Sequence, residues 1–182
     1  MTIDTAAPTL IAGTWAIDPS HSTVAFTARH LMSKVRGTFT EFSGEFVTTG
    51  NPLESTISVT IEAPSINTNS EQRDNHLRSA DFFDPEKGGV LTFVSTDVAP
   101  AGDGYVVTGD LTINGVTRSV ALDTEFFGVE VDGYGRTVLG AEASTTIDRH
   151  DYNVSWNMPL EGDRLLVGPK VKIDLSVEAV LA

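Results

Sequence analysis

Cysteine is missing from all 182 residues of the chain. This absence excludes disulfide bonds, thiolate nucleophiles and cysteine-based zinc sites, but it fits a reducing or an oxidising compartment equally well. Long apolar runs are missing as well, since no window approaches the roughly 18 apolar residues of a membrane-spanning helix. We therefore expect no stable insertion into a membrane.

Positive charge is scarce. Twelve lysine and arginine residues stand against 25 aspartate and glutamate residues, which gives a formal net charge of −13 at pH 7. Such a surface repels nucleic-acid phosphates and anionic membrane surfaces at long range. We therefore expect no nucleic-acid partner.

The N-terminal segment has no basic region, and its apolar run over residues 10–12 is too short for a signal peptide. Residues 1–11 are expected to form a flexible lead-in. A cytoplasmic protein is therefore predicted; a periplasmic or secreted one would follow if a signal had been removed.

Apolar and polar residues alternate with period 2 along most of the chain, as in antiparallel strands with one wet face. Val24, Phe26 and Ala28 alternate with polar or small neighbours, and Asn114-Gly115 is a strong signal for a type I′ hairpin turn. Strands are expected at about 13–18, 22–30, 36–48, 54–63, 90–98, 104–113, 116–130 and 136–148, with a last one near 164–181.

Two segments break this pattern. Residues 69–80 are predicted to form a short helix capped by Asn69 or Ser70, and residues 149–163 are predicted to form a loop. Many strands, few helices and no second layer favour a sheet closed on itself. The sequence thus predicts an all-β fold, an eight-stranded antiparallel barrel over residues 12–182 with one short helix.

The segment RDNHLRSADFFD, residues 73–84, is the most informative part of the chain. A charged helical turn runs directly into Phe82 and Phe83, which Asp81 and Asp84 bracket. A polar helix that ends in an aromatic pair can close one end of a barrel over an apolar interior. This arrangement favours a container for an apolar molecule over a catalyst.

The charged residues of this segment, Arg73, Asp74, His76 and Arg78, have two interpretations. Arg73 or His76 meets a polar head group at the barrel mouth, or the group pairs with neighbouring carboxylates and pins the helix to the rim. Exposed pairs of this kind contribute little stability each.

An enzyme or a metal-binding protein that uses His21, His30, Asp74 and His76 on a small or lipid substrate is the alternative hypothesis. His21 and His30 are nine residues apart, which places them on opposite faces of an uninterrupted strand. The sequence has no HxH or HExxH motif. We expect His21 to belong to the turn over residues 18–21 and to hydrogen-bond backbone, and we predict no catalytic residue, metal or cofactor. A barrel with a core filled by side chains is a third hypothesis.

Several blocks of the chain resemble the YceI-like family. They are WAIDPSHSTVAF at 15–26, HLMSKVRGTF at 30–39, RDNHLRSADFFD at 73–84, LTFVST at 91–96 and GDLTINGVT at 109–117. The resemblance runs from about residue 13 to the C-terminus. It implies a lipocalin-like barrel that binds, carries or stores a polyisoprenoid, an isoprenoid quinone or a similar long-chain amphiphile without catalysis. It also implies a homodimer.

On this hypothesis two groups of residues are candidates for the binding site. The apolar lining is predicted to include Phe26, Phe39, Phe42, Leu77, Phe82, Phe83, Phe93 and Trp156. The mouth of the barrel is predicted to include Arg29, His30 and Arg73.

Overall fold

The computed structural model describes residues 9–182, so most of the predicted lead-in lies outside the described residues. Within these residues, eleven strands form a single antiparallel sheet that closes on itself, because β1 pairs with both β4 and β11. The strands are β1 (Gly13–Ile17), β2 (Thr23–His30), β3 (Ser33–Phe39), β4 (Phe42–Thr48), β5 (Thr56–Glu62), β6 (Ile66–Asn67), β7 (Val90–Ala101), β8 (Gly104–Ile113), β9 (Val116–Val131), β10 (Thr137–Asp148) and β11 (Val167–Leu181).

At three positions around the barrel, two short strands lie end to end and together take the place of one long strand. The eleven strands therefore fill eight positions. β1 and β2 lie end to end along β11, and the 3-10 helix η1 (Pro19–His21) separates them. β4 and β3 follow in the next position, where they pair with β1 and β2. β5 and β6 come next, since they pair with β4 and β3. The predicted eight-stranded antiparallel barrel is confirmed.

One predicted strand boundary is wrong. The segment expected as a single strand over 36–48 is two strands, β3 and β4, because the chain bends at Thr40 and Glu41. There the backbone N–H and the hydroxyl of Thr40 both donate to the carbonyl oxygen of Ser65. These bonds come from a residue 25 positions away and leave the regular ladder.

The turn residues and the helix cap in the sequence correctly predicted a hairpin turn and a helix. Asn114 and Gly115 have φ of 52° and 72°, which agrees with the predicted type I′ turn. The helix α1 (Glu71–Leu77) is shorter than the predicted 69–80, and Ser70 caps it by accepting a hydrogen bond from the backbone N–H of Arg73. The segment predicted as a loop over 149–163 begins with the 3-10 helix η5 (Arg149–Tyr152).

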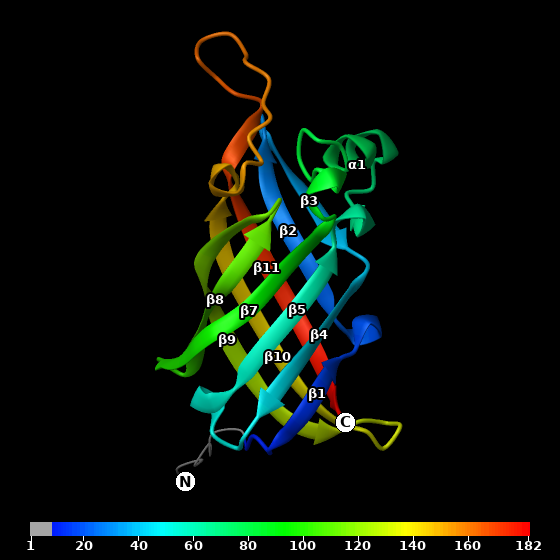
Figure 1. Cartoon of the computed structure of the whole chain (residues 1–182), viewed down its shortest axis with the longest axis vertical. Helices are drawn as coiled ribbons and strands as arrows, with labels where there is room; N and C mark the ends of the chain where they lie inside the picture. Colours follow the sequence, from blue (N-terminus) through cyan, green and yellow to red (C-terminus); the bar gives the residue numbers. More distant parts are fainter. Residues whose placement is uncertain (1–8) are drawn as a thin grey trace.

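The barrel has two differently built ends, and Figure 1 shows both. We call the end that carries α1 and the loop between η5 and β11 the upper end. The lower end carries β1 and the C-terminus. There Trp15 is fully buried beside Leu139 and Ala179, in a cluster separate from the main core. No helix within residues 9–182 is long and apolar enough to cross a membrane.

Candidate ligand-binding site

A cavity of about 230 Å³ lies inside the barrel toward its lower end, and we call it the lower chamber. The inward positions of β4, β5, β7 and β9 supply much of its wall, because alternate residues of a strand face the same side. Apolar side chains dominate this wall. They include Phe42, Phe46, Ile57, Val59, Phe93 and Leu122, and Glu142 is the single charged residue at the wall among those described.

A second cavity of about 550 Å³, the upper chamber, lies toward α1 and η5. This volume falls within the range of roughly 300 to 1,000 Å³ that is usual for small-molecule sites. The two chambers abut, since five apolar residues line both: Phe26, Phe39, Leu91, Ile113 and Ile173. The interior therefore has room along its length, which contradicts the hypothesis of a filled core.

The upper chamber differs from the lower one in charge. Three arginines and two histidines line it: Arg29, His30, Arg73, His76 and Arg149. Among the described residues, no aspartate or glutamate does so. In a chain with a net charge of −13, this concentration of basic side chains sets the upper chamber apart.

Aromatic side chains from three segments meet at the top of the upper chamber. The His76 ring lies 4.6 Å from the Trp156 ring and 5.1 Å from the Phe82 ring, between centroids, and both pairs are edge-on. Phe83 packs edge-on against Phe39 at 5.9 Å. Edge-on geometry is the favoured arrangement for aromatic pairs. The segment 73–84 therefore covers this end of the cavity, as its sequence suggested.

The helix α1 is fixed to the barrel by polar contacts with the segment before it. The buried Asp74 carboxylate accepts hydrogen bonds from the backbone N–H and the hydroxyl of Thr68 at 2.9 and 2.5 Å. Arg73 donates to the hydroxyl and the carbonyl oxygen of Thr68 at 2.7 and 2.8 Å. These bonds hold Arg73 at the chamber wall.

Of the other two charged residues of the segment, His76 pairs with a carboxylate as the pinning interpretation expects, whereas Arg78 bonds carbonyl oxygens instead. His76 pairs with Asp81 at 2.8 Å, and Arg78 donates to the carbonyl oxygens of Pro64 and Ile66. Asp74 and His76 point to different partners, as expected from residues two apart on a helix.

Arg149 organises the opposite wall, and sequence reasoning missed it. The side chain is only 4% exposed and donates to four backbone carbonyls, those of Val154, Trp156, Val167 and Gly168. Burial lowers the pKa of its guanidinium. All four acceptors are main-chain atoms, two in the loop after η5 and two at the start of β11, so no pattern of residue types predicts this contact.

Tyr152 was also missed. It lines the upper chamber and is 1% exposed, and its hydroxyl has no hydrogen-bond partner among the described residues. Burial raises the pKa of Tyr152 to about 12, so the hydroxyl keeps its proton and can donate. A buried hydroxyl without a partner costs about 1–3 kcal/mol.

The four residues of the alternative hypothesis do not form one site. His21 lies toward the lower end and lines neither chamber, and Asp74 is occupied by Thr68. Only His30 and His76 line the same cavity. Within residues 9–182, no hydrogen bond joins any two of the four.

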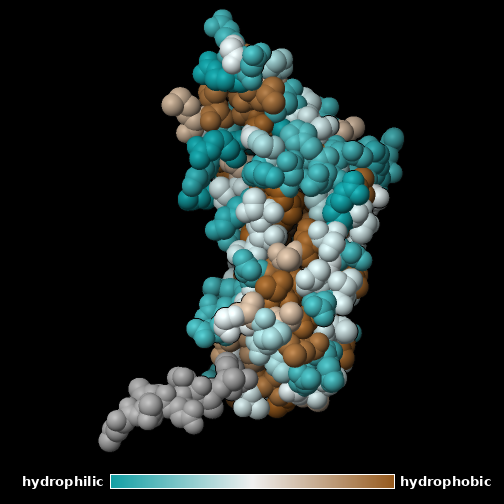
Figure 2. Space-filling model, turned by 90° about the vertical axis from the view of Figure 1, so that its left-hand side faces the viewer, coloured by the Kyte–Doolittle hydropathy of each residue, from teal (hydrophilic) through white to brown (hydrophobic). Residues whose placement is uncertain are grey.

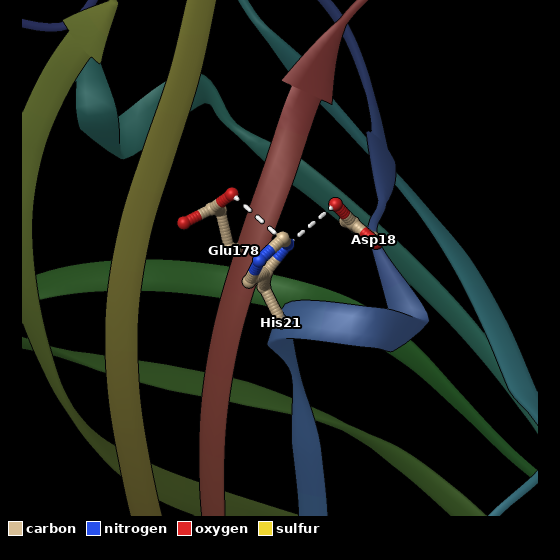
Figure 3. Close-up of side chains that lie close together, drawn as sticks. All are labelled: Asp18, His21 and Glu178. Carbon is tan, nitrogen blue, oxygen red and sulfur yellow. Dashed lines mark hydrogen bonds and ion pairs between the residues drawn. The ribbon is translucent and has the colours of Figure 1, made fainter. Parts of the chain in front are cut away.

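His21 belongs instead to an ion-paired cluster with Asp18 and Glu178, which Figure 3 shows. Its Nδ1 lies 2.9 Å from an Asp18 oxygen and 3.7 Å from a Glu178 oxygen. The turn was predicted correctly, but the expected backbone partner for the side chain was wrong, because the side chain bonds a carboxylate. The hydrogen bond from His21 holds the pKa of Asp18 far below its usual range, and Asp18 raises the pKa of His21.

One imidazole and two carboxylates are ligand types that a zinc ion accepts. In this cluster the Nδ1 that would bind a metal is already hydrogen-bonded to Asp18. The Arg136 guanidinium also lies 3.4 Å from the same Asp18 oxygen. A cation beside the carboxylate opposes a second one, so the cluster is better described as an ion pair.

All eleven residues predicted for the binding site border a chamber. Phe42 and Phe93 line the lower one, and Phe26 and Phe39 line both. The upper chamber is bordered by Arg29, His30, Arg73, Leu77, Phe82, Phe83 and Trp156. Arg29 is exposed and lies at the rim, whereas His30 is half-buried.

Comparison with known proteins gives consistent matches. A family model described as the YceI-like domain matches residues 15–179. A UPF0312 protein of Photorhabdus laumondii is 42% identical over 151 residues, which cover 81% of this chain and 79% of that protein.

Solved structures show the same fold. BcnA of Burkholderia cenocepacia aligns with a TM-score of 0.75 at 25% identity over 89% of this chain and 98% of its own. A polyisoprenoid binding domain from Saccharophagus degradans, implicated in plant cell wall breakdown, aligns with a TM-score of 0.69 at 16% identity. That alignment covers 94% of this chain and 99% of the domain.

Proposed function

Because the chain belongs to the family of YceI-like domains, we propose that it binds a long-chain amphiphile inside its barrel, with a polyisoprenoid or an isoprenoid quinone as the ligand class. The tail occupies the lower chamber, and the polar head lies in the upper chamber. The observation that carries this proposal is the pair of abutting cavities, one apolar and one bordered by basic and hydroxyl side chains.

The name of one structural relative supports the ligand class. The domain from Saccharophagus degradans is described as polyisoprenoid binding, and it shares the fold of this chain. The basic side chains of Arg29 and Arg73 at the upper chamber support a ligand with a polar head.

The free energy of burying the lipid tail favours reversible carriage over permanent sequestration of the lipid. Burial of one five-carbon isoprene unit from water gains roughly 4 kcal/mol, at about 0.8 kcal/mol for each methylene group. Such a lipid resides in a membrane, however, and its transfer into a barrel exchanges one apolar surrounding for another. The net gain is small, so binding is reversible and the chain acts as a carrier or reservoir.

We propose no catalytic step at this site. General acid–base chemistry needs a titratable group within hydrogen-bond reach of the reacting atom and of a partner that orients it. Asp81 orients His76, but among the described residues no other side chain of the alternative hypothesis forms a hydrogen bond with His76. The arrangement supports binding.

Extraction of the purified, untagged protein with organic solvent, followed by mass spectrometry, tests the proposal. We expect a stoichiometric long-chain lipid from the wild type. Phe83→Asp places a charge against Phe39 and lowers the retained lipid several-fold, because an unpaired buried charge is costly.

Phe127→Asp is the matched control, since Phe127 is 54% exposed and lines neither chamber. Circular dichroism verifies that both variants fold, and Phe83→Ala replaces the aspartate variant if that one does not. A wild-type extract without lipid, or equal retention by the Phe83 and Phe127 variants, would contradict the proposal.

A further inference from the structure

The turn between β2 and β3 places two apolar side chains in solvent. Leu31 is 47% exposed and Met32 is 89% exposed. Leu31 also adopts φ of 53°, a left-handed conformation that two-residue hairpin turns usually give to glycine or asparagine. A bulky residue in this conformation is strained, and strain of this kind accompanies functional surfaces.

A second exposed apolar segment lies beside this turn. Met158 and Leu165, in the loop between η5 and β11, are 49% and 56% exposed. The backbone N–H of Leu31 donates to the carbonyl oxygen of Leu166 at 2.8 Å, so the hairpin and the loop are adjacent. We call Leu31, Met32, Met158 and Leu165 the apical patch. Figure 2 shows apolar surface gathered near the upper end of the molecule.

Basic residues flank the turn. Residues 29–36 contain Arg29, Lys34 and Arg36 and no acidic residue, although the net charge of the chain is −13. Arg29 and Lys34 face each other across the two strands. None of these three side chains forms an ion pair within residues 9–182. On the neighbouring loop, Glu161 and Asp163 lie beside Arg164 and reduce the local positive charge there.

The apical patch lies at the border of the upper chamber. His30 precedes Leu31 and lines the chamber, and Leu166 follows Leu165 and lines it too. Any surface that covers the patch therefore also lies next to residues that border the upper chamber.

We propose that the apical patch docks the barrel onto the surface of an anionic lipid bilayer. Leu31 and Met32 enter the boundary between head groups and acyl chains, as exposed apolar side chains of peripheral proteins do. Arg29, Lys34 and Arg36 meet the anionic head groups, where each basic residue strengthens binding by about fivefold. The net charge of −13 opposes approach from a distance, so contact is confined to this one basic and apolar hairpin.

Vesicle flotation tests the docking surface. The full chain is mixed with vesicles of phosphatidylcholine alone or of phosphatidylcholine with phosphatidylglycerol. We expect binding to the anionic vesicles to exceed binding to the neutral ones at least fivefold and to weaken as salt is added. The double variant Leu31→Asn/Met32→Ser removes both apolar side chains and tolerates the left-handed turn, and it binds at least tenfold more weakly.

Tyr134→Ser is the matched control, because Tyr134 is 85% exposed in the β9–β10 turn at the lower end. We expect it to float like the wild type. Failure of the wild type to float with either vesicle type, or flotation of the double variant at wild-type levels, would overturn the proposal.

A second copy of the chain is the competing occupant of the patch. Light scattering on the same variants detects such a dimer. If the wild type is a dimer and the double variant is a monomer that still floats with vesicles, membrane docking is overturned. Flotation does not require that a lipid is retained inside the barrel. The docking proposal and the proposed function can therefore fail independently.

Discussion

The two ends of the barrel are closed by different means. At the lower end, continuous ladders join β1 to β4 and to β11, and Trp15 fills the interior with no exposed surface. At the upper end, closure depends on α1, η5 and a loop in which a single isolated bridge pairs Pro159 with Leu165. Segments with few ladder hydrogen bonds open at a lower free-energy cost than paired strands. The upper end should therefore open more readily than the lower end.

The same contrast extends to the residues that line the chambers. The lower wall is mainly apolar, whereas the upper wall carries the basic side chains of Arg29 and Arg73. A ligand with one apolar and one polar end therefore has a single favourable orientation.

The two tryptophans give the largest expected effect. Trp15→Ala removes a fully buried side chain and its hydrogen bond to the Thr48 hydroxyl, so it should lower the free energy of unfolding by about 3–5 kcal/mol. Trp156→Ala removes a half-buried side chain from the upper end. It should lower the free energy of unfolding less than Trp15→Ala does, and it should reduce the amount of retained lipid more. Urea unfolding and solvent extraction measure the two properties. Equal destabilisation by the two changes would break the comparison between the ends.

A change within the lower wall has a smaller, selective effect. Ala143 on β10 lines the lower chamber, and Ala143→Leu narrows it. We expect the retention of long prenyl chains to fall roughly tenfold relative to short ones, since the loss of two methylene contacts costs about 1.6 kcal/mol. Competition between prenyl chains of different length measures this ratio. Ala121→Leu, on an exposed position of β9, is the matched control, and an equal ratio for both variants would refute the role of this chamber as the tail site.

The smallest expected effect concerns the ion-paired cluster toward the lower end. Asp18 raises the pKa of His21 above its ordinary 6.5. The stabilisation from protonated His21 is therefore fully present below about pH 6.5 and is lost as pH rises through the raised value. The wild type should exceed His21→Gln in unfolding free energy at pH 6, and this difference should shrink toward pH 9. The difference is small because the His21 side chain is 52% exposed, and water screens its interaction with Asp18.

Nuclear magnetic resonance titration of the His21 ring supplies the direct test. A midpoint at the ordinary pKa would contradict the pairing. Lipid retention at the upper end should not change in His21→Gln, which separates this cluster from the binding site.

Period-2 alternation and turn residues were sufficient to predict the barrel, because each strand carries its own inward and outward faces. The break at Thr40 could not be predicted, since it depends on a carbonyl 25 residues away. The aromatic cover was found because RDNHLRSADFFD is contiguous in the sequence. Arg149 and Tyr152 were not found from the sequence. The four carbonyl groups around Arg149 and the burial of Tyr152 arise only when the chain has folded.

Closure of the barrel also has a consequence for biosynthesis. The seam joins Trp15 to Leu181, so the first strand finds its final neighbour only when the last strand exists. At about 5–20 residues per second, the ribosome needs roughly 10 to 40 s to make the whole chain. During that time the apolar interior has an open side, so we expect the unfinished barrel to be prone to aggregation.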